Sequence, residues 1–493
     1  MAKFDIFLIK LSLVLFIEIT CVLGKSFRTH KLDDEFSGLK TTKLSPDESN
    51  SNSLEYKVYN YTQTLDHFNF NPDSYMTFPQ RYVVVDKYWG GTTNSSLIFV
   101  YTGETTDIIE DVKYGGFPPV LASRFNALLL YIEHRYYGTS TPFGSREEAY
   151  KNTTTLGYFT TEQVLADYAQ LIIDVKKNMS AENCPVIVIG ASLGGIHASW
   201  FRLKYPHIAY GAYASSTPIL YFPGLGTPEN GYSVVVSNNF NTTSTSCYNT
   251  IRESWFEIDR VAAQSDGLSS LSQMFNTCMP LNTSKDLKIN LEARYNGWAE
   301  FDDPASNYLQ LFCNATDEGG QKTYILNKII NGFVAMRGQR CINIVDFSPR
   351  YDSGWDWQTC TEMVIPTGRG ENDTMFQADP FDLYKYTKEC QQVFGVTPKP
   401  YQISLEFGGY GIKTVLEKFA SNIIFSNGLR DPYSSGGVLQ NISDSVLAIN
   451  TQEGHHALDM NTPMATDPDW LVAQRDTVIN VIQGWLSKYV VPN

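Results

Sequence analysis

The stretch Pro185-Val-Ile-Val-Ile-Gly-Ala-Ser-Leu-Gly194 decides the fold. Its apolar half, residues 185–189, is continuous rather than alternating, which is typical of a strand buried on both faces of a parallel sheet. Residues 190–194 match the pattern Gly-x-Ser-x-Gly, and a helical pattern follows directly up to Tyr205. In that setting the serine stands on a sharp turn at the end of the sheet, with its hydroxyl exposed. The stretch therefore predicts a nucleophile at Ser192; a helix that Ser192 merely caps is the plainer alternative.

Similar apolar runs elsewhere predict the rest of an α/β sheet. Continuous runs are typical of strands that helices cover on both faces. Strands are expected at residues 97–101, 127–132, 211–214, 422–426 and 446–450. Helices are expected between strands, as at 161–177, and at the end of the chain, at 471–489.

The middle of the chain differs from the parts that flank it. Residues 219–345 contain few strand-like runs, several cysteines, and helical stretches at 250–261 and 327–336. We expect this segment to form a mainly helical, disulfide-stapled cap, inserted into an α/β core made of residues 56–218 and 346–493.

The histidines narrow the choice of a base. A serine hydroxyl is a weak nucleophile unless a base takes its proton, and in an α/β-hydrolase the base follows the serine in the chain. Two of the seven histidines, His197 and His207, belong to the predicted helix after Ser192 or to its end, where they are badly placed to face it. The doublet His455-His456 follows the predicted strand 446–450 and contains the candidate base.

The acid and the oxyanion hole follow from the same order of residues. Asp431 comes after the predicted strand 422–426 and before a proline, which makes it the candidate acid; a turn carboxylate is the alternative reading. Acyl transfer also needs backbone amides that bind the oxyanion. We expect these from Leu193 and from the loop of Gly103 and Glu104.

The composition excludes several classes of protein. Of the 493 residues, 43% are hydrophobic, which suffices for a core and excludes a disordered chain. The net charge of −14 argues against a nucleic-acid binder, which presents a basic surface. The sequence has neither a P-loop nor an HExxH motif, so we expect neither a metal nor another cofactor.

The N-terminus and the sequons predict a lysosomal or extracellular protein. Residues 1–24 carry lysines and an apolar run that ends in Val-Leu-Gly, the pattern of a signal peptide; a signal anchor is the alternative, but the run is short for a membrane span, so we expect no stable membrane anchor. Residues 25–55 are polar, as in a leader or propeptide. Sequons predict N-glycosylation at Asn60, Asn94, Asn152, Asn178, Asn241, Asn282, Asn314, Asn372 and Asn441.

The number of cysteines predicts a free thiol. Removal of the signal peptide takes Cys21 away and leaves seven cysteines, an odd number, for disulfides in an oxidising compartment. Cys184, alone at the head of the predicted strand 185–189, is the candidate for a buried thiol. The chain has no Cys-x-x-Cys pair, which argues against a structural zinc site.

Short motifs follow one another along the chain. They are Gln63-Thr-Leu-Asp-His-Phe68, Tyr101-Thr-Gly103, Glu133-His-Arg-Tyr-Tyr-Gly138, Glu162-Gln-Val-Leu-Ala-Asp-Tyr168, Trp200-Phe-Arg-Leu-Lys-Tyr-Pro206, Trp355-Asp-Trp-Gln358, Cys360-Thr-Glu-Met363, Phe425-Ser-Asn-Gly428, Asp431-Pro432 and Gly454-His-His456. In this order, from about Tyr56 to the C-terminus, they resemble the serine carboxypeptidase family of lysosomal Pro-X carboxypeptidase and dipeptidyl peptidase II.

The resemblance implies an α/β-hydrolase core with a helical cap, and cleavage next to a penultimate proline. It assigns the nucleophile to Ser192 and the orienting acid to Asp431. The family has His two residues after the glycine, which selects His456 rather than His455 as the base. The resemblance also implies three disulfides, with Cys184 free: Cys247–Cys313, Cys278–Cys341 and Cys360–Cys390.

Two positions depart from the family pattern. Tyr433 stands where the family usually has Trp after Asp-Pro, and we expect it to line the site. Gly368 stands where the carboxypeptidase branch has a further cysteine. The segment that contains Trp355, Trp357 and Met363 is a candidate wall of the substrate pocket, or ordinary packing around a disulfide.

The favoured function is a serine exopeptidase that releases the C-terminal residue after a proline. Residues 363–366 and 394–396 look closer to the carboxypeptidase branch of the family. The rival is a dipeptidyl aminopeptidase, which needs carboxylates for an ammonium where a carboxypeptidase needs donors or a cation for a carboxylate. An esterase or lipase and a catalytically silent adhesion protein are further alternatives. The expected partners are peptides with proline next to the cleaved terminus and, in a homodimer, a second copy of the chain.

Overall fold

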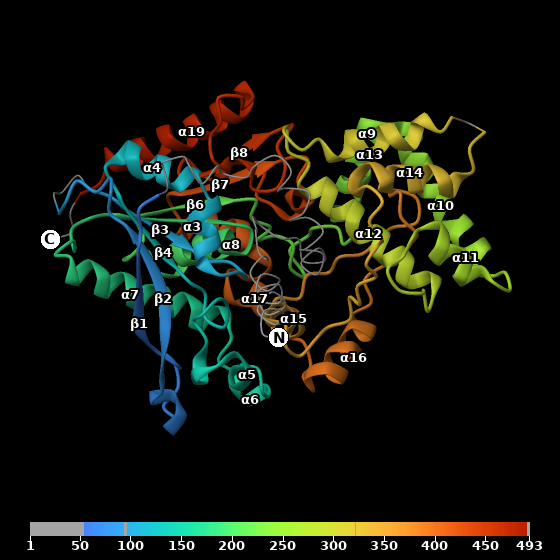
Figure 1. The fold of residues 1–493 in the computed structure, drawn as a ribbon. Helices are drawn as coiled ribbons and strands as arrows, with labels where there is room; N and C mark the ends of the chain where they lie inside the picture. Colours follow the sequence, from blue (N-terminus) through green and yellow to red (C-terminus); the bar gives the residue numbers. More distant parts are fainter. Residues whose placement is uncertain (1–53, 93–95, 321, 491–493) are drawn as a thin grey trace, which may run out of the picture.

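The computed structural model describes residues 54–92, 96–320 and 322–490. The predicted signal peptide, nearly all of the predicted leader and the sequon at Asn94 lie outside these ranges. Within them, eight strands form one twisted sheet in the order β1-β2-β4-β3-β5-β6-β7-β8 (Figure 1). The strands are β1 Lys57–Thr64, β2 Thr77–Val85, β3 Ile98–Thr102, β4 Leu128–Ile132, β5 Val186–Ala191, β6 Gly211–Ser215, β7 Ile423–Gly428 and β8 Val446–Thr451.

This sheet confirms the α/β-hydrolase expectation. Strands β3 to β8 pair in parallel, while β1 and β2 form an antiparallel hairpin whose second strand runs antiparallel to β4. All six predicted strands are present to within two residues at each end. The hairpin of β1 and β2 was not predicted, because most side chains of β1 are exposed and its sequence has no continuous apolar run.

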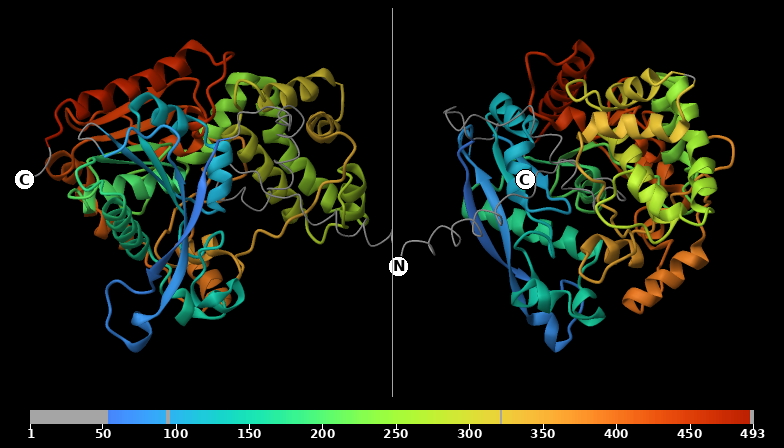
Figure 2. Two further views of the ribbon diagram at one scale, coloured as in Figure 1. Left: turned by 60° about the vertical axis from the view of Figure 1, so that its left-hand side comes forward. Right: turned by 45° about the vertical axis from the view of Figure 1, so that its right-hand side comes forward.

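Helices cover both faces of the sheet and give the core its two halves. One face packs against α7 (Thr161–Asn178), α8 (Ser192–Lys204), α17 (Gln402–Glu406) and α18 (Ile412–Phe419). The other packs against α3 (Ile108–Tyr114), α4 (Phe117–Phe125) and α19 (Asp469–Leu486). Figure 2 shows the sheet edge-on between these layers. The remaining short elements are α5 Arg146–Ala149, α6 Thr153–Leu156, η2 Pro72–Tyr75, η3 Pro142–Gly144, η4 Gly409–Gly411, η5 Pro432–Gly436 and η6 Leu458–Met460.

A helical body lies beside the sheet and forms the cap (Figure 1, green to yellow). Its helices are α9 Gly231–Thr243, α10 Thr245–Ala262, α11 Gly267–Met274, α12 Ser284–Glu300, α13 Tyr308–Glu318 and α14 Ile325–Arg337. They enclose a core of their own, in which Trp298 packs on Phe312 and Phe333. Two further helices, α15 Gly354–Thr361 and α16 Leu383–Phe394, follow before the chain returns to α17. The division of the chain at residues 219 and 345 stays a prediction.

Three disulfides staple the helical parts of the chain. Cys247–Cys313 joins α10 to α13, Cys278–Cys341 joins the segments that follow α11 and α14, and Cys360–Cys390 joins α15 to α16. These are the pairs that the family resemblance implies. The third pair lies outside residues 219–345, so only two of the three staple the predicted cap.

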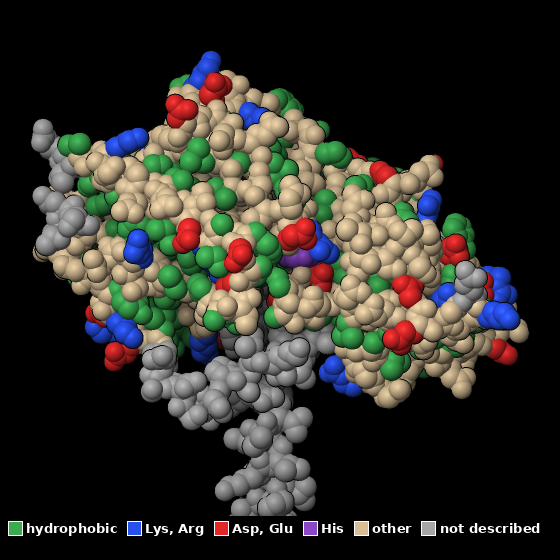
Figure 3. Space-filling model, turned by 90° about the horizontal axis from the view of Figure 1, so that it is seen from above, with side chains coloured by type: hydrophobic (Ala, Val, Ile, Leu, Met, Phe, Trp, Pro, Cys, Tyr) green, Lys and Arg blue, Asp and Glu red, His purple; other side chains and the backbone are tan. Residues whose placement is uncertain are grey.

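Figure 3 shows the molecule from above. On this face, basic and acidic side chains lie scattered among uncharged ones rather than gathered into one basic area. Of the nine sequon asparagines, the eight that the structure describes are exposed, as a glycosylated side chain must be.

We predict that Cys184 is the one free thiol among residues 54–490, and that it is unreactive in the folded protein. Its side chain is fully buried at the head of β5, out of reach of an alkylating agent. The protein is labelled with iodoacetamide without reductant, either folded or unfolded, and the labelled cysteines are identified by peptide mass spectrometry. We expect no label on the folded protein and label on Cys184 alone in the unfolded protein. The same protein unfolded with reductant is the control, in which all seven cysteines react. Labelling of any other cysteine without reductant would contradict the disulfide pattern.

Candidate active site

Ser192 stands at the turn between β5 and α8, and the glycines around it explain the turn. Its φ of 50° lies in the left-handed region, which non-glycine residues seldom adopt. A Cβ on Gly190 would lie 2.2 Å from the backbone carbon of Gly194, and one on Gly195 would lie 2.1 Å from Oγ1 of Thr217. Only glycine therefore lets the strand, the turn and the helix approach this closely, which is what a nucleophile elbow requires.

Asp431 and His456 meet beside the parallel ends of β7 and β8. Nδ1 of His456 lies 2.9 Å from Oδ2 of Asp431, and neither side chain is more than 1% exposed. The other oxygen of Asp431 accepts a hydrogen bond of 2.9 Å from the backbone N–H of Tyr433, which fixes the carboxylate. Because the carboxylate accepts a hydrogen bond from Nδ1–H, Nε2 is left as the basic nitrogen of the neutral ring. Nε2 is buried and has no hydrogen-bond partner among the described residues.

The second histidine of the doublet points elsewhere. Nδ1 of His455 lies 3.1 Å from the carbonyl oxygen of Ala299, at the end of α12, and donates to it. Its Nε2 lies 4.0 Å from Oδ2 of Asp302. Of the two histidines that the sequence left open, the structure therefore brings His456 to Asp431.

Carboxyl groups around His456 govern its protonation. Burial alone lowers the pKa of His456, but Asp431, Glu300 and Glu104 outweigh burial and raise it to about 9. Glu104 is 6% exposed, and burial raises the pKa of its carboxyl to about 7 despite the opposing effects of His456 and the Tyr101 hydroxyl. The side chain of Glu104, expected only for its amide, thus also contributes to the electrostatics of the site.

The expected oxyanion donors differ in their availability. The N–H of Gly103 donates to the carbonyl oxygen of Ile132 at 3.0 Å, so of the two amides that the sequence left open in this loop, that of Gly103 is already engaged. The N–H of Leu193 lies in the first turn of α8, where no carbonyl four residues earlier in the helix can accept it. Leu193 and Glu104 remain the candidate donors.

Aromatic side chains from the cap and from η5 stand near His456. The rings of Tyr433 and Phe301 lie 5.3 and 6.1 Å from the His456 ring, and Tyr232 packs at 4.9 Å on Tyr433. Tyr232 also donates a hydrogen bond of 3.0 Å to Glu300. The sequence did not predict Tyr232, Glu300 and Phe301 as site residues, because they belong to the cap and no motif surrounds them.

The predicted wall residues of the 355–363 segment have mostly structural surroundings. Trp357 packs at 5.6 Å on Phe394, in an apolar cluster that contains the Cys360–Cys390 disulfide. Trp355 and Met363 belong to the core cluster on the α7 and α8 face of the sheet. These contacts favour ordinary packing for Trp357.

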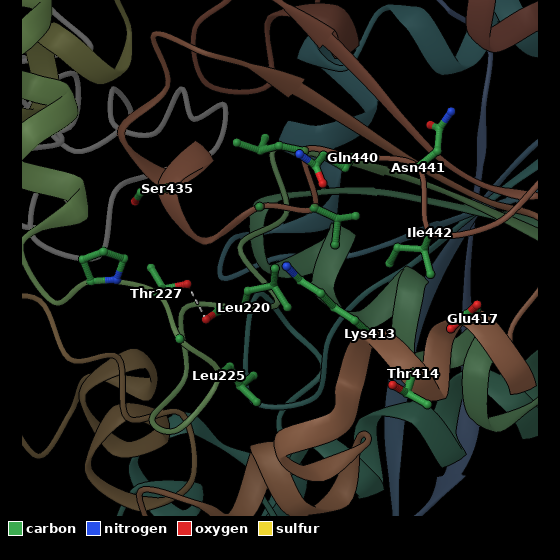
Figure 4. Close-up of a pocket in the computed structure, with 15 residues that line it drawn as sticks. Leu220, Leu225, Thr227, Lys413, Thr414, Glu417, Ser435, Gln440, Asn441 and Ile442 are labelled. Atoms are coloured by element: carbon green, nitrogen blue, oxygen red, sulfur yellow. Dashed lines mark hydrogen bonds between the residues drawn. The ribbon is translucent and has the colours of Figure 1, made fainter.

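A cavity of about 540 Å³ lies behind the acid loop, but it is not the site of the triad. It is lined by the chain after Pro432 and by the loop of residues 220–228, together with Lys413 and Glu417 of α18 (Figure 4). In Figure 4, Thr227 donates to the carbonyl oxygen of Leu220 at 2.6 Å and so closes part of the rim. None of Ser192, Asp431 and His456 lines this cavity.

Comparison with known proteins fits this geometry. Residues 63–478 match the family Serine carboxypeptidase S28. The chain belongs to this family. It is therefore a serine-type peptidase, and peptides are its substrates.

Relatives of this peptidase align over most of its length. It is 37% identical to the lysosomal Pro-X carboxypeptidase of Homo sapiens over 454 residues, which cover 88% of this chain and 89% of the relative. The protein of that name in Bos taurus is 36% identical, with 89% and 90% covered. The thymus-specific serine protease of Homo sapiens is 27% identical, with 86% of each chain covered. In the described ranges of this peptidase, every helix is too short or too polar to cross a membrane.

We predict that Glu104→Gln moves the acid limb of kcat/KM to lower pH. Glutamine keeps the shape of Glu104 but removes a charge that raises the pKa of His456, so the neutral, basic form of His456 persists to lower pH. The measurement is kcat/KM against pH for both proteins on one peptide. Glu417→Gln, a change in an exposed carboxylate outside the triad, is the control. An acid limb that stays in place or moves to higher pH would count against this role of Glu104.

Proposed function

We propose that this peptidase is a Pro-X carboxypeptidase, which releases the C-terminal residue of a peptide after a proline. The identity of 37% to a lysosomal Pro-X carboxypeptidase over nearly the whole chain carries this proposal. The hydrogen bond between Asp431 and His456 and the left-handed turn at Ser192 support it, since both belong to a serine triad.

The reaction proceeds through an acyl-enzyme. Nε2 of His456 takes the proton of the Ser192 hydroxyl as Oγ attacks the carbonyl carbon of the proline. Asp431 keeps the Nδ1 proton facing it and stabilises the imidazolium that forms. The imidazolium then gives its proton to the nitrogen of the leaving residue. Water repeats the sequence, releases the proline carboxylate and restores the serine.

The surroundings of the triad suit this substrate. The backbone N–H groups of Leu193 and Glu104 bind the oxyanion. The rings of Tyr433, Tyr232 and Phe301 offer an apolar wall to the proline ring. Tyr433, where the family usually has tryptophan, leaves more room at this wall than the larger residue.

A dipeptidyl aminopeptidase is the second candidate, and one observation favours it. Besides Asp431, the buried carboxyl groups of Glu104 and Glu300 act on His456. Carboxylates close to the scissile bond attract the free N-terminal ammonium of an aminopeptidase substrate and repel the C-terminal carboxylate of a carboxypeptidase substrate. At a pH where Glu104 is protonated, this preference weakens, because a neutral carboxyl can donate a hydrogen bond to a carboxylate.

We also place the peptidase in the secretory pathway, in lysosomes or outside the cell. Eight exposed sequon asparagines and three disulfides support this placement, because both modifications arise in that pathway. Relatives named lysosomal favour the lysosome.

A peptide with a blocked N-terminus, a single proline and the ending Pro-Phe-OH tests the carboxypeptidase. We expect the parent to release free phenylalanine and Ser192→Ala to be slower by at least about 10⁴-fold. The measurement is chromatography of the products. The matched peptide has a free N-terminus, proline at its second position and an amidated C-terminus. Cleavage of the second peptide alone would replace the carboxypeptidase by the aminopeptidase.

Asp431→Asn tests the role of the acid. Asparagine keeps an acceptor for the Tyr433 N–H, but its amide favours the wrong tautomer of His456, so kcat is expected to fall by about 10⁴-fold. Steady-state kinetics measure this loss, and thermal unfolding monitors the fold. Asp444→Asn, in the exposed loop before β8, is the control and should retain the parent rate. Equal rates for Asp431→Asn and the parent would remove Asp431 from the triad.

A further inference from the structure

A carboxylate of the cap lies between the chain neighbours of the acid and of the base. Asp302 follows α12, and its side chain is 9% exposed. Its Oδ2 lies 3.5 Å from Nη2 of Arg430 and 4.0 Å from Nε2 of His455. Arg430 directly precedes Asp431, and His455 directly precedes His456. The Asp302 carboxylate thus faces both the loop of the acid and the loop of the base.

Backbone groups of the cap reinforce the same connection. The last carbonyl groups of a helix have no acceptor role within it, so other donors must satisfy them. At the end of α12, Ala299 accepts from the His455 ring at 3.1 Å and Glu300 accepts from the backbone N–H of His456, also at 3.1 Å. From α9, the Asn239 amide donates to the carbonyl oxygen of Arg430 at 2.6 Å.

We propose that Asp302 is a positioning residue, which fixes the acid loop to the cap by holding Arg430 beside the end of α12 that binds His455 and His456. We call the pair of side chains of Asp302 and Arg430 the cap latch. The proposal rests on the proposed triad, in which Asp431 and His456 act together. Because the cap then holds the acid loop and the base loop side by side, Asp302 helps to set the distance between Asp431 and His456.

The energetic reason is the sensitivity of proton transfer to geometry. A displacement of about 1 Å in a catalytic group costs about 100-fold in rate. The loops at 429–431 and 453–456 have no regular secondary structure at the triad residues themselves. Besides the core, the cap latch and the two carbonyl groups of α12 therefore hold them in place.

Charged groups around Asp302 decide when the cap latch is ionised. Arg430 faces Asp302 and also lies 3.5 Å from Glu453, while Asp303 adds a like charge and Asp431 acts on His455. Burial raises the pKa of Asp302 to about 6, although the Leu309 N–H and Arg430 oppose this rise. Burial and Arg430 lower the pKa of His455 to about 4, so the ring is neutral when Asp302 ionises. Its proton is then on Nδ1 and faces Ala299, so the attraction of the Asp302 carboxylate is to Arg430.

The variants separate the contacts of the cap latch. Asp302→Asn keeps the oxygen that accepts the Leu309 N–H at 3.1 Å, and so keeps the start of α13, but it loses the charge. Arg430→Met keeps the length of the side chain but removes the charge that faces Asp302. Asp303→Asn is the matched control, because the Asp303 side chain accepts hydrogen bonds from the N–H groups of Ala305 and Ser306 in its own turn. The charge of Asp303 also raises the pKa of Asp302, so the comparison is made at a pH at which Asp302 is ionised in both proteins.

The measurement uses the full-length protein and a fluorophosphonate probe, which reacts with an activated serine without needing a peptide pocket. Oγ of Ser192 bonds to phosphorus, fluoride leaves, and the serine proton passes to His456. The rates are compared at about pH 7.5, where Asp302 is ionised. We expect Asp302→Asn to react about tenfold more slowly than both the parent and Asp303→Asn, as for loss of a hydrogen bond between charged groups. The same loss should appear in kcat of the Pro-Phe-OH peptide, with KM little changed.

The pH dependence separates positioning from a merely structural role. As the pH falls through about 6, Asp302 of the parent takes a proton, and the parent and Asp302→Asn should converge in probe rate. A ratio of the two rates that stays constant from about pH 5 to about pH 8 would overturn the proposal. Equal rates for Asp302→Asn and the parent at about pH 7.5 would also overturn it. Thermal unfolding identifies a variant that fails to fold; in that event, Arg430→Met tests the cap latch, and a parent rate for it would overturn the proposal.

The probe also keeps this proposal distinct from the proposed function. If the parent reacts with the probe but releases no phenylalanine from the peptide, the carboxypeptidase fails while the cap latch stands or falls on the probe rates. If the parent does not react with the probe at all, the triad fails, and the cap latch fails with it.

Discussion

The absence of space for a Cβ at the turn after β5 is the constraint on which the site depends. Gly194 approaches the carbonyl oxygen of Thr102 so closely that a Cβ would lie 2.4 Å from it. The hydroxyl of Thr102 in turn donates toward the carbonyl oxygens of Ile189 and Gly194, at 3.1 and 2.7 Å. The end of β3, and with it Glu104, is thereby fixed against the first turn of α8. The nucleophile and one expected oxyanion donor therefore share a single rigid junction, which belongs entirely to the core.

His456 is held differently, because both the core and the cap contact its loop. From the core, Asp459 accepts hydrogen bonds from Tyr213 at 2.6 Å and from Ser215 and Ser426 at 2.5 Å, which anchors the chain three residues after His456. From the cap, the end of α12 binds the backbone of His456. A movement of α12 must therefore disturb the base before it disturbs the nucleophile, so cap and core are joined at the residue whose geometry matters most.

The sequence predicted those features that local physics specifies. Buried parallel strands appear as continuous apolar runs, and the order of serine, acid and histidine found Asp431 and the histidine doublet. The β1 strand was missed because its exposed residues lack such a run. The choice between the Gly103 and Glu104 amides stayed open in the sequence, because the bond from Gly103 to Ile132 continues the pairing of β3 with β4, which no pattern near Gly103 encodes. Glu300 and Phe301 reach His456 only through the packing of the cap, more than 150 residues away in the chain.

The pKa shifts of buried groups make the stability of the fold depend on pH in two opposite ways. Burial raises the pKa of Glu362 from 4.5 to about 8, and that of Glu104 to about 7. The folded chain holds these protons more tightly than the unfolded chain, so the free energy of unfolding falls as the pH rises from 4.5 through these values. Burial lowers the pKa of His134 to about 4, so stability is also lost as the pH falls below 6.5 toward that value. Between pH 4.5 and 6.5 the two effects oppose each other, since Glu362 and Glu104 hold their protons there while burial keeps His134 neutral.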